Sequence, residues 1–296
     1  MEQKITPLVS VIIPSAHRKP SIVFRAINSV LTQTYKTLEI ILVDDNTDTN
    51  LSYEIKDAFK NISQVKYIKN IGIHGASAAR NLGISYANGE IIAFLDDDDE
   101  WLPKKIEKQI NALTDDVVLV YCNGWRIDNR CNPPLIIPYR SKENFYSSVS
   151  FNFLLQKNHI GTTTQLLVRK NALEQVDGFD INFPARQDYD LCLRLTQIGQ
   201  AVGVDDFLFC HYLHNDKQIT KSSSASLVGY TSILRKYQKE LQNEPYALSC
   251  ILFKIARMQR LQQHMFKAVY YYLKGVFINP ILWRKGLREL ISEKTV

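Results

Sequence analysis

Five consecutive acidic residues, Asp96 to Glu100, directly follow the apolar run at 91–95. Alternate residues of an extended segment point to the same side, so Asp96 and Asp98 are placed to share one divalent cation. Carboxylate oxygens without Cys or His suit the hard ions Mg²⁺ and Mn²⁺. A solvated acidic helix start is the alternative, because acidic side chains favour the positive end of the helix dipole. The run adjoins an apolar strand rather than a polar linker, and we therefore expect a metal site.

A second polar cluster, Asp44-Asp45-Asn46, follows the apolar run at 38–43. Carboxylates at the end of a parallel strand either accept hydrogen bonds from a base or ribose or cap a turn, and the sequence leaves both open. Neither G-x-G-x-x-G nor G-x-x-x-x-G-K-[ST] occurs, which argues against a backbone phosphate cradle and against dehydrogenases and P-loop enzymes. A metal would then neutralise most of the charge of a bound diphosphate.

The elements that position these acids are short apolar runs that alternate with helical patterns. Nearly continuous β-branched runs of this kind predict a mostly parallel sheet with helices on both faces. Ligands bind outside the carboxyl ends of such strands, which is where both acidic clusters fall. The strands are expected at 8–14, 38–43, 65–68, 91–95 and 117–121, and the helices near 20–34, 51–60, 75–87 and 103–113.

Beyond residue 121 the pattern is mixed. We expect a polar loop at 128–142, a helix near 147–156, a strand at 163–169, a helix at 188–198 and two short strands at 201–204 and 207–212. The serine-rich stretch 222–226 indicates a boundary. Two domains are therefore predicted: a catalytic domain at 1–224 and a basic helical subdomain at 225–296.

Six motifs give the chain a specific resemblance. They are V-S-V-I-I-P-S (9–15), N-S-V-L-T-Q-T-Y (28–35), L-E-I-I-L-V-D-D-N-T-D (38–48), A-R-N-L-G-I (79–84), G-E-I-I-A-F-L-D-D-D-D-E-W-L-P (89–103), and G-F-D (178–180) with Q-D-Y-D-L-C-L-R-L (187–195). Together they resemble the family 2 glycosyltransferases of GT-A fold, over residues 8–215. The resemblance implies a Rossmann-like α/β domain, here with a C-terminal α-helical extension. It also implies transfer of a sugar from a nucleotide-diphosphate donor, UDP-linked by expectation, to an acceptor hydroxyl, with inversion of the anomeric centre.

The resemblance implies roles for individual residues. The donor would be bound by the end of the first strand and by residues that follow later strands. The metal would be held by one aspartate of the acidic run and a C-terminal histidine. The implied donor-binding residues are Pro14, Ser15, Asp45, Arg80, Asp96 and Asp97, and the implied metal ligands are Asp98 and His214.

Asp188 is implied as the catalytic base, and it starts a predicted helix whose dipole favours the ionised carboxylate. An ordinary helix N-cap is the alternative for this residue. Gln187, implied to lie at the acceptor, stands where the family has Glu, and an amide does not raise the pKa of its neighbour by like-charge repulsion. Ala16 and His17 replace the aromatic residue and Asn that the family usually has, so that base stacking is either weaker or supplied by His17.

Composition and charge exclude several other classes of protein. A hydrophobic content of 45% and a charged content of 22% exclude a disordered or fibrous protein. Residues 1–224 carry 24 basic and 26 acidic side chains, a net of −2, whereas 225–296 carry 12 and 4, a net of +8. The whole excess of +6 therefore belongs to the helical tail. An acidic cleft repels phosphates, so we expect no nucleic-acid partner despite the basic tail.

The setting expected from these observations is cytoplasmic. Five cysteines without C-x-x-C spacing indicate reduced thiols, and neither a signal peptide nor a membrane-spanning run is found. From the family we expect synthesis of capsule, O-antigen or lipopolysaccharide on a glycan or lipid-linked glycan acceptor. The basic tail then either contacts anionic lipid at the inner face of the membrane or presents a solvated face. Homo-oligomerisation stays open, and the rival functions are a sugar-phosphate nucleotidyltransferase and a non-catalytic glycan- or nucleic-acid-binding protein.

Overall fold

The computed structural model describes residues 6–213 and 223–292. The chain forms two compact units that interleave in sequence. The first comprises Met1–Val149, Ile160–Phe179 and Arg194–His214, and the second comprises Ser150–His159, Asp180–Leu193 and Asn215–Val296. The predicted division at residue 224 stays a prediction.

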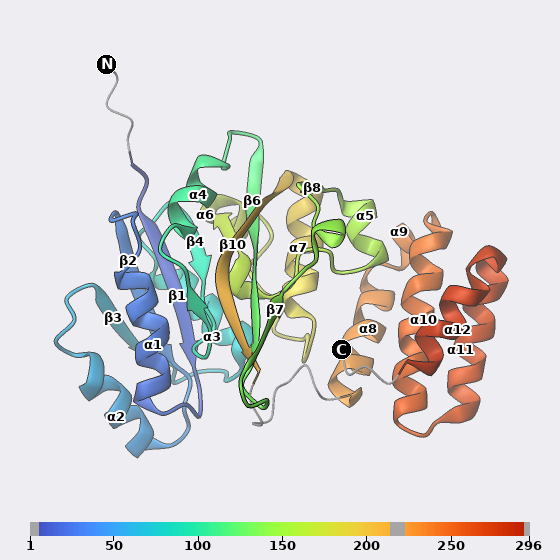
Figure 1. Ribbon diagram of the computed structural model, residues 1–296, viewed down its shortest axis with the longest axis horizontal. Coiled ribbons are helices and arrows are strands. Elements are labelled where there is room, and N and C mark those ends of the chain that lie inside the picture. The colour runs from blue at the N-terminus through green and yellow to red at the C-terminus, as the bar shows by residue number, and fades with distance from the viewer. Residues whose placement is uncertain (1–5, 214–222, 293–296) are drawn as a thin grey trace. The chain divides into compact units, whose positions relative to one another are not determined.

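The first unit contains a parallel sheet with the strand order β3-β2-β1-β4 (Figure 1). Its strands are β1 (Val9–Ser15), β2 (Leu38–Asp44), β3 (Val65–Lys69) and β4 (Ile91–Phe94). All three pairings are parallel, and Ser15 is in register with Asp44, so these strands end at one edge of the sheet. This part of the sheet was predicted from the apolar runs.

Helices cover both faces of this sheet because alternate residues of β1 point in opposite directions. Val11 and Ile13 pack in one cluster with α1 (Pro20–Leu31), whose first helical position is Pro20. Ile12 lies on the other face beneath Gly83 of α3 (Ala76–Tyr86), where an added Cβ would be 2.4 Å from the isoleucine side chain. The remaining helices of this half are α2 (Thr49–Phe59) and α4 (Lys105–Asn111).

The other half of the sheet is mixed, with the order β4-β9-β6-β10-β5. The short strand β9 (Leu167–Arg169) is antiparallel to both β4 and β6 (Val117–Asp128). β10 (Gln200–Leu213) runs parallel to β6 and antiparallel to β5 (Glu100–Trp101) and β8 (Ser148–Val149). The short helices of this half are η1 (Lys142–Asn144), η2 (Thr163–Gln165) and α6 (Lys170–Gln175).

Two sequence predictions are wrong here. The loop expected at 128–142 contains the strand β7 (Leu135–Pro138), which pairs with β6 although all four of its residues are exposed. The two strands expected at 201–204 and 207–212 are one strand, β10, whose register shifts between Val204 and Phe207. That irregularity falls where Asp205 and Asp206 interrupt the apolar pattern.

The second unit is helical, with α10 (Pro245–Leu261) packed by α5 (Phe151–Gln156), α8 (Ser223–Lys236), α11 (Met265–Ile278) and α12 (Trp283–Ile291). Figure 1 shows α10, α11 and α12 beside one another. The short elements α9 (Gln238–Gln242) and η4 (Pro280–Leu282) connect these helices, and α11 ends immediately before Asn279-Pro280. The helix α7 (Gln187–Ile198), which was expected at 188–198, begins in this unit. Within the described residues, none of the helices has the length and apolar character needed to span a bilayer.

Candidate active site

The acidic run lies directly after β4, at the edge where the parallel strands end. Asp97 is 8% exposed and Asp99 is fully buried. Three threonines from the turn before β9 hold the run: Thr163 donates to Asp96 Oδ1 (2.9 Å), Thr162 to Asp96 Oδ2 (3.3 Å) and Thr164 to Asp99 Oδ2 (2.6 Å). The run is therefore a buried carboxylate cluster rather than a solvated helix start.

Three arginines balance the charge of this cluster. Arg18, from the loop after β1, donates to Asp98 Oδ2 at 2.5 Å, and its Nε lies 3.5 Å from Asp97 Oδ1. Arg25 of α1 donates to the backbone carbonyl of Asp98 at 2.5 Å. Arg80 of α3 donates through Nη2 to Asp96 Oδ1 at 2.7 Å.

Arg80 is 6% exposed, and its Nε and Nη1 have no hydrogen-bond partner among the described residues. A guanidinium has five N–H donors in a fixed fork, so Arg80 retains unpaired N–H groups next to the carboxylate that it binds. Buried polar groups are normally paired, and unpaired donors indicate a place for a ligand's acceptor oxygens.

The carboxylates of the run differ in pKa. Burial alone would raise the pKa of Asp96, but the charge of Arg80 and hydrogen bonds from Arg80 and Thr163 outweigh it and lower the pKa. Burial and the neighbouring Asp98 carboxylate raise the pKa of Asp97 to about 7. Burial, together with the charges of Asp99 and Asp96, raises the pKa of Asp98 to about 6. The crowding of negative charge on buried oxygens is what a bound cation would relieve.

Strand β10 adds a histidine to the cluster. His211 Nδ1 lies 3.0 Å from Asp99 Oδ1, and the Tyr212 backbone N–H donates to the same oxygen at 3.3 Å. Burial lowers the pKa of His211, but the charge and hydrogen bond of Asp99 and the charges of Asp96 and Asp98 outweigh it and raise the pKa. The raised pKa favours the imidazolium form, whose positive charge would offset part of the negative charge of the run.

Asp45 organises the neighbouring strand ends. Its Oδ1 accepts from Asn70 at 2.6 Å and lies 2.9 Å from His74 Nδ1, and its Oδ2 accepts from the Gly75 N–H at 2.8 Å. The Asp45 N–H in turn donates to the Ser15 carbonyl at 2.8 Å. These contacts join the ends of β1, β2 and β3 to the start of α3.

Gly75 allows this arrangement through its backbone. Its φ of +120° is open to glycine and strained for other residues. No atom lies within 4 Å of an added Cβ, so conformation and not space requires glycine there. The neighbouring Asp44 is fully buried and bonded to Tyr67 (2.6 Å) and Lys69 (3.1 Å), so it has a structural role between β2 and β3.

Gln187 and Asp188 lie in the first turn of α7, and both side chains are half-buried. Buried contacts fix this turn within the second unit. Asp190, fully buried, accepts from Lys236 Nζ (2.8 Å) and from the Tyr237 hydroxyl (3.0 Å). The Tyr189 hydroxyl donates to the Leu154 carbonyl at 2.5 Å.

The structure brings together Ser15, Asp45, Arg80 and the acidic run at one edge of the sheet, next to Pro14 at the end of β1. His214 lies outside the described residues. Among the residues that are described, no three His, Cys, Asp or Glu side chains converge to hold a metal ion. The roles predicted for these residues stay predictions.

Several residues of this site were not predicted as such. Arg18, Arg25 and His211 contact the acidic run from segments far away in sequence. The threonines at 162–164 were expected only at the start of a strand. Thr163 and Thr164 instead lie in the short helix η2, and Thr162 directly precedes it.

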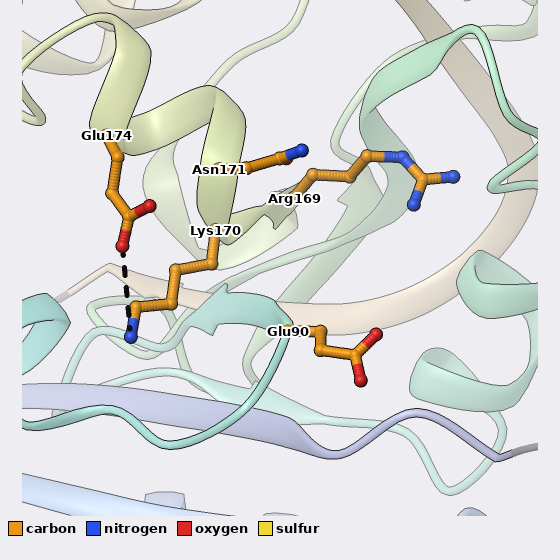
Figure 2. A pocket seen from close by; sticks show the side chains of 5 residues that line it. All are labelled: Glu90, Arg169, Lys170, Asn171 and Glu174. Atoms are coloured by element: carbon orange, nitrogen blue, oxygen red, sulfur yellow. Dashed lines mark ion pairs between the residues drawn. The ribbon is translucent and has the colours of Figure 1, made fainter.

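A small pocket lies elsewhere in the first unit, at the start of β4 and the end of β9 (Figure 2). Its cations are already engaged, because Arg169 donates to the carbonyls of Val117 and Thr114 (both 2.9 Å) and Lys170 to that of Ala87 (2.9 Å). Figure 2 shows the pairing of Lys170 with Glu174 at 3.9 Å. This pocket is a structural junction, and the site at the acidic run remains the candidate.

Comparisons with known proteins agree with this choice. A family model described as Glycosyl transferase family 2 matches residues 10–177. The Escherichia coli protein named UDP-Glc:alpha-D-GlcNAc-diphosphoundecaprenol beta-1,3-glucosyltransferase WfgD is 29% identical over 219 residues, which cover 74% of this chain and 80% of that protein.

Two solved structures share the fold. Residues 1–349 of S. aureus TarS in complex with UDP-GlcNAc align with a TM-score of 0.59 and 14% identity, over 95% of this chain and 91% of that one. The mannosyltransferase PcManGT from Pyrobaculum calidifontis, in complex with GDP-Man and Mn²⁺, aligns with a TM-score of 0.63 and 14% identity, over 98% and 82%. The fold is that of the GT-A glycosyltransferases.

Proposed function

The chain belongs to glycosyl transferase family 2, and from that premise we propose that it is an inverting glycosyltransferase that uses a nucleotide-sugar donor. The observation that carries the proposal is the run Asp96–Asp99 at the carboxyl edge of the sheet, in which Asp97 and Asp99 are buried and Asp96 and Asp98 are bonded to Arg80 and Arg18. A site that holds several carboxylates and guanidiniums together suits a ligand with both hydroxyl and phosphate groups.

The donor half of the proposal assigns a UDP-sugar. WfgD is named as a UDP-glucose enzyme, and TarS is described with UDP-GlcNAc, whereas PcManGT is described with GDP-Man. Asp45 with Ser15 would face the nucleoside, and Asp96 and Asp97 the ribose and sugar. The unpaired Nε and Nη1 of Arg80 would donate to the donor's oxygens.

A divalent cation fits the chemistry of the acidic run. Carboxylate oxygens are the donors that Mg²⁺ and Mn²⁺ prefer, and the raised pKa values of Asp97 and Asp98 report negative charge that a cation would neutralise. Asp98 and His214 would hold the ion, and the ion would stabilise charge on the departing diphosphate. Because Arg18 is bonded to Asp98 at 2.5 Å, its guanidinium must leave that oxygen before a metal can take it.

Asp188 is proposed as the base of a single displacement. The acceptor hydroxyl gives its proton to the Asp188 carboxylate, its oxygen bonds to the sugar C1, and the bond from C1 to the diphosphate breaks with its electron pair on the diphosphate. Attack opposite the leaving group inverts the anomeric centre. The contacts of Asp190 and Tyr189 hold the turn that carries Asp188, and Gln187 would hydrogen-bond the acceptor.

The acceptor and the setting complete the proposal. WfgD is named for a GlcNAc-diphosphoundecaprenol acceptor, and we assign this chain a lipid-linked glycan acceptor in bacterial surface-polysaccharide synthesis. With such an acceptor, sugar transfer would take place at the inner face of the cell membrane, and residues 225–296 would make the peripheral contact with the membrane.

A panel of nucleotide sugars with Mn²⁺ tests the donor and metal assignments by thermal shift and by nucleotide release. We expect one UDP-sugar to stabilise the wild type, and Asp98→Ala to abolish the Mn²⁺-dependent part, whereas the exposed control Asp57→Ala keeps it. Donor binding unchanged in Asp98→Ala would contradict the metal assignment. Release of pyrophosphate from a nucleoside triphosphate and a sugar phosphate would instead identify a nucleotidyltransferase, and a glycan-binding protein would bind no nucleotide.

Asp188→Asn tests the base. Loss of a positioned base lowers turnover by about 100-fold or more, while donor binding stays unchanged. The matched control is Asp115→Asn, at an exposed position. Full turnover in Asp188→Asn would remove this residue from the mechanism.

A further inference from the structure

The helix α11 presents its large apolar residues outward and its small ones inward. Phe266 is 95% exposed and Phe277 is 87% exposed, whereas Ala268 and Gly275 are buried. A Cβ added to Gly275 would lie 2.6 Å from the Phe253 ring of α10, so the small residues let α11 lie close against α10. This is the reverse of an ordinary surface helix, whose apolar stripe faces the core.

The exposed residues form one stripe along α11. At 100° per residue, five apolar side chains fall within about 100° of the helix circumference, opposite Gly275. Lys267 and Lys274 are exposed and lie along one side of the stripe. The stripe consists of Phe266, Val269, Tyr270, Leu273 and Phe277, all between 47% and 95% exposed.

The helix α12 repeats the pattern. Trp283, Leu287 and Ile291 are 46%, 40% and 61% exposed and follow one another at intervals of four residues. Arg284 and Arg288 are exposed and lie next to that row, each one residue after an apolar member. The opposite side is buried through Gly286, where an added Cβ would lie 2.5 Å from Phe253.

The net charge of this region indicates which kind of partner covers the apolar surface. Residues 265–292 carry five basic side chains and one acidic one, Glu289, which is paired with Arg257 at 3.0 Å. A symmetric contact with a second copy would bring the same lysines and arginines together, so self-association is disfavoured. Exposed aromatic and aliphatic side chains flanked by cations match the boundary between the acyl chains and the headgroups of an anionic bilayer.

We propose that the apolar stripes of α11 and α12, with their flanking lysines and arginines, form a docking surface for an anionic membrane. The aromatic and aliphatic side chains enter the headgroup region, and Lys267, Lys274, Arg284 and Arg288 contact lipid phosphates. The proposal deepens the membrane contact stated above, and it needs no sugar-transfer chemistry.

Flotation of the full chain with lipid vesicles tests the surface. On vesicles of 60% phosphatidylcholine and 40% phosphatidylglycerol we expect binding at least tenfold stronger than on pure phosphatidylcholine, weakened by 0.5 M NaCl. The double variant Phe266→Ser/Phe277→Ser should lose at least tenfold, and Lys267→Glu/Lys274→Glu should lose binding selectively on the anionic vesicles. The matched controls, Tyr53→Ser and Lys56→Glu on exposed positions of α2, should bind as wild type does.

Three outcomes overturn the proposal. The first is that the wild type does not bind anionic vesicles, and the second is that the stripe variants bind these vesicles as strongly as the wild type does. The third is that the wild type forms a dimer, the Phe266→Ser/Phe277→Ser variant does not, and neither protein binds vesicles. The vesicles contain no glycan or nucleotide, so the result is independent of the glycosyltransferase assignment. Thermal melting of each variant confirms folding, which the high exposure of both phenylalanines predicts.

Discussion

Lys105 is a fully buried lysine under the candidate site, and among the described residues its ammonium group contacts an amide and an indole ring rather than a carboxylate. Its Nζ donates to Gln109 Oε1 at 2.6 Å and lies 4.1 Å from the centre of the Trp101 ring. The Trp101 indole N–H donates to the Thr164 carbonyl, and the Thr164 hydroxyl bonds to Asp99. Lys105 is therefore connected to the acidic run through Trp101 and Thr164.

Burial lowers the pKa of Lys105 from its ordinary 10.5 to about 8. Below pH ~8 the lysine is charged in both the folded and unfolded states, and burial of the charge costs about 3 kcal/mol, at ~1.4 kcal/mol per pKa unit. Between pH ~8 and ~10.5 only the unfolded state stays protonated, so this cost falls as pH rises. The contact with Trp101 offsets about 1 kcal/mol of it.

The variant Lys105→Met removes the charge and leaves Gln109 Oε1 without a donor, which costs about 1 kcal/mol. We expect the free energy of unfolding to rise by about 1 kcal/mol at pH 7. Between pH 7 and pH 9.5 the free energy of unfolding of the wild type should rise by about 2 kcal/mol relative to that of the variant.

Urea denaturation of both proteins at pH 7, 8, 9 and 9.5 measures this difference, and the comparison cancels titrations that the two proteins share. A difference that is constant across this range would refute the reasoning, because it would mean that Lys105 has an ordinary pKa. Lys104→Met, at an exposed position directly before α4, is the control and should show no such trend.

Three further changes test the supports of the site. Lys236→Met removes the cation that pairs with the buried Asp190 carboxylate at 2.8 Å, and it should lower the free energy of unfolding by about 2 kcal/mol in urea. Gly75→Ala meets no atom but forces alanine to φ +120°, so it should cost about 1–2 kcal/mol and weaken UDP binding in calorimetry. Thr164→Val removes the 2.6 Å hydrogen bond to Asp99, and it should lower the melting temperature by an amount that corresponds to about 2 kcal/mol.

The parallel half of the sheet and the acidic run were accessible from the sequence for one physical reason. Strands buried on both faces are continuous apolar runs, and residues that follow such runs lie at one edge. Asp45 and Asp96 could therefore be assigned to the same edge from local pattern alone. The helical start at Asp188 followed in the same way, because an acidic first turn precedes an amphipathic pattern.

The rest depends on contacts between distant segments. The insertion of β9 between β4 and β6 brings Thr162–Thr164 to the acidic run, and nothing in the local pattern encodes that strand order. Arg18 and Arg25 follow β1 by only a few residues, but they reach Asp98 across more than 70 positions. The helical character of 225–296 was predicted, yet the outward apolar face of α11 became apparent only from the packing of Gly275 on Phe253.

The anomeric configuration of the product is the direct test of sugar transfer with inversion. The full chain is incubated with the UDP-sugar that stabilises it, Mn²⁺ and a polyprenyl-diphosphate-linked sugar acceptor, and the new linkage is read by proton NMR. We expect a product whose anomeric configuration is opposite to that of the donor, formed by the wild type and about 100-fold more slowly by Asp188→Asn. A product with the donor's configuration would rule out a single displacement at the sugar C1.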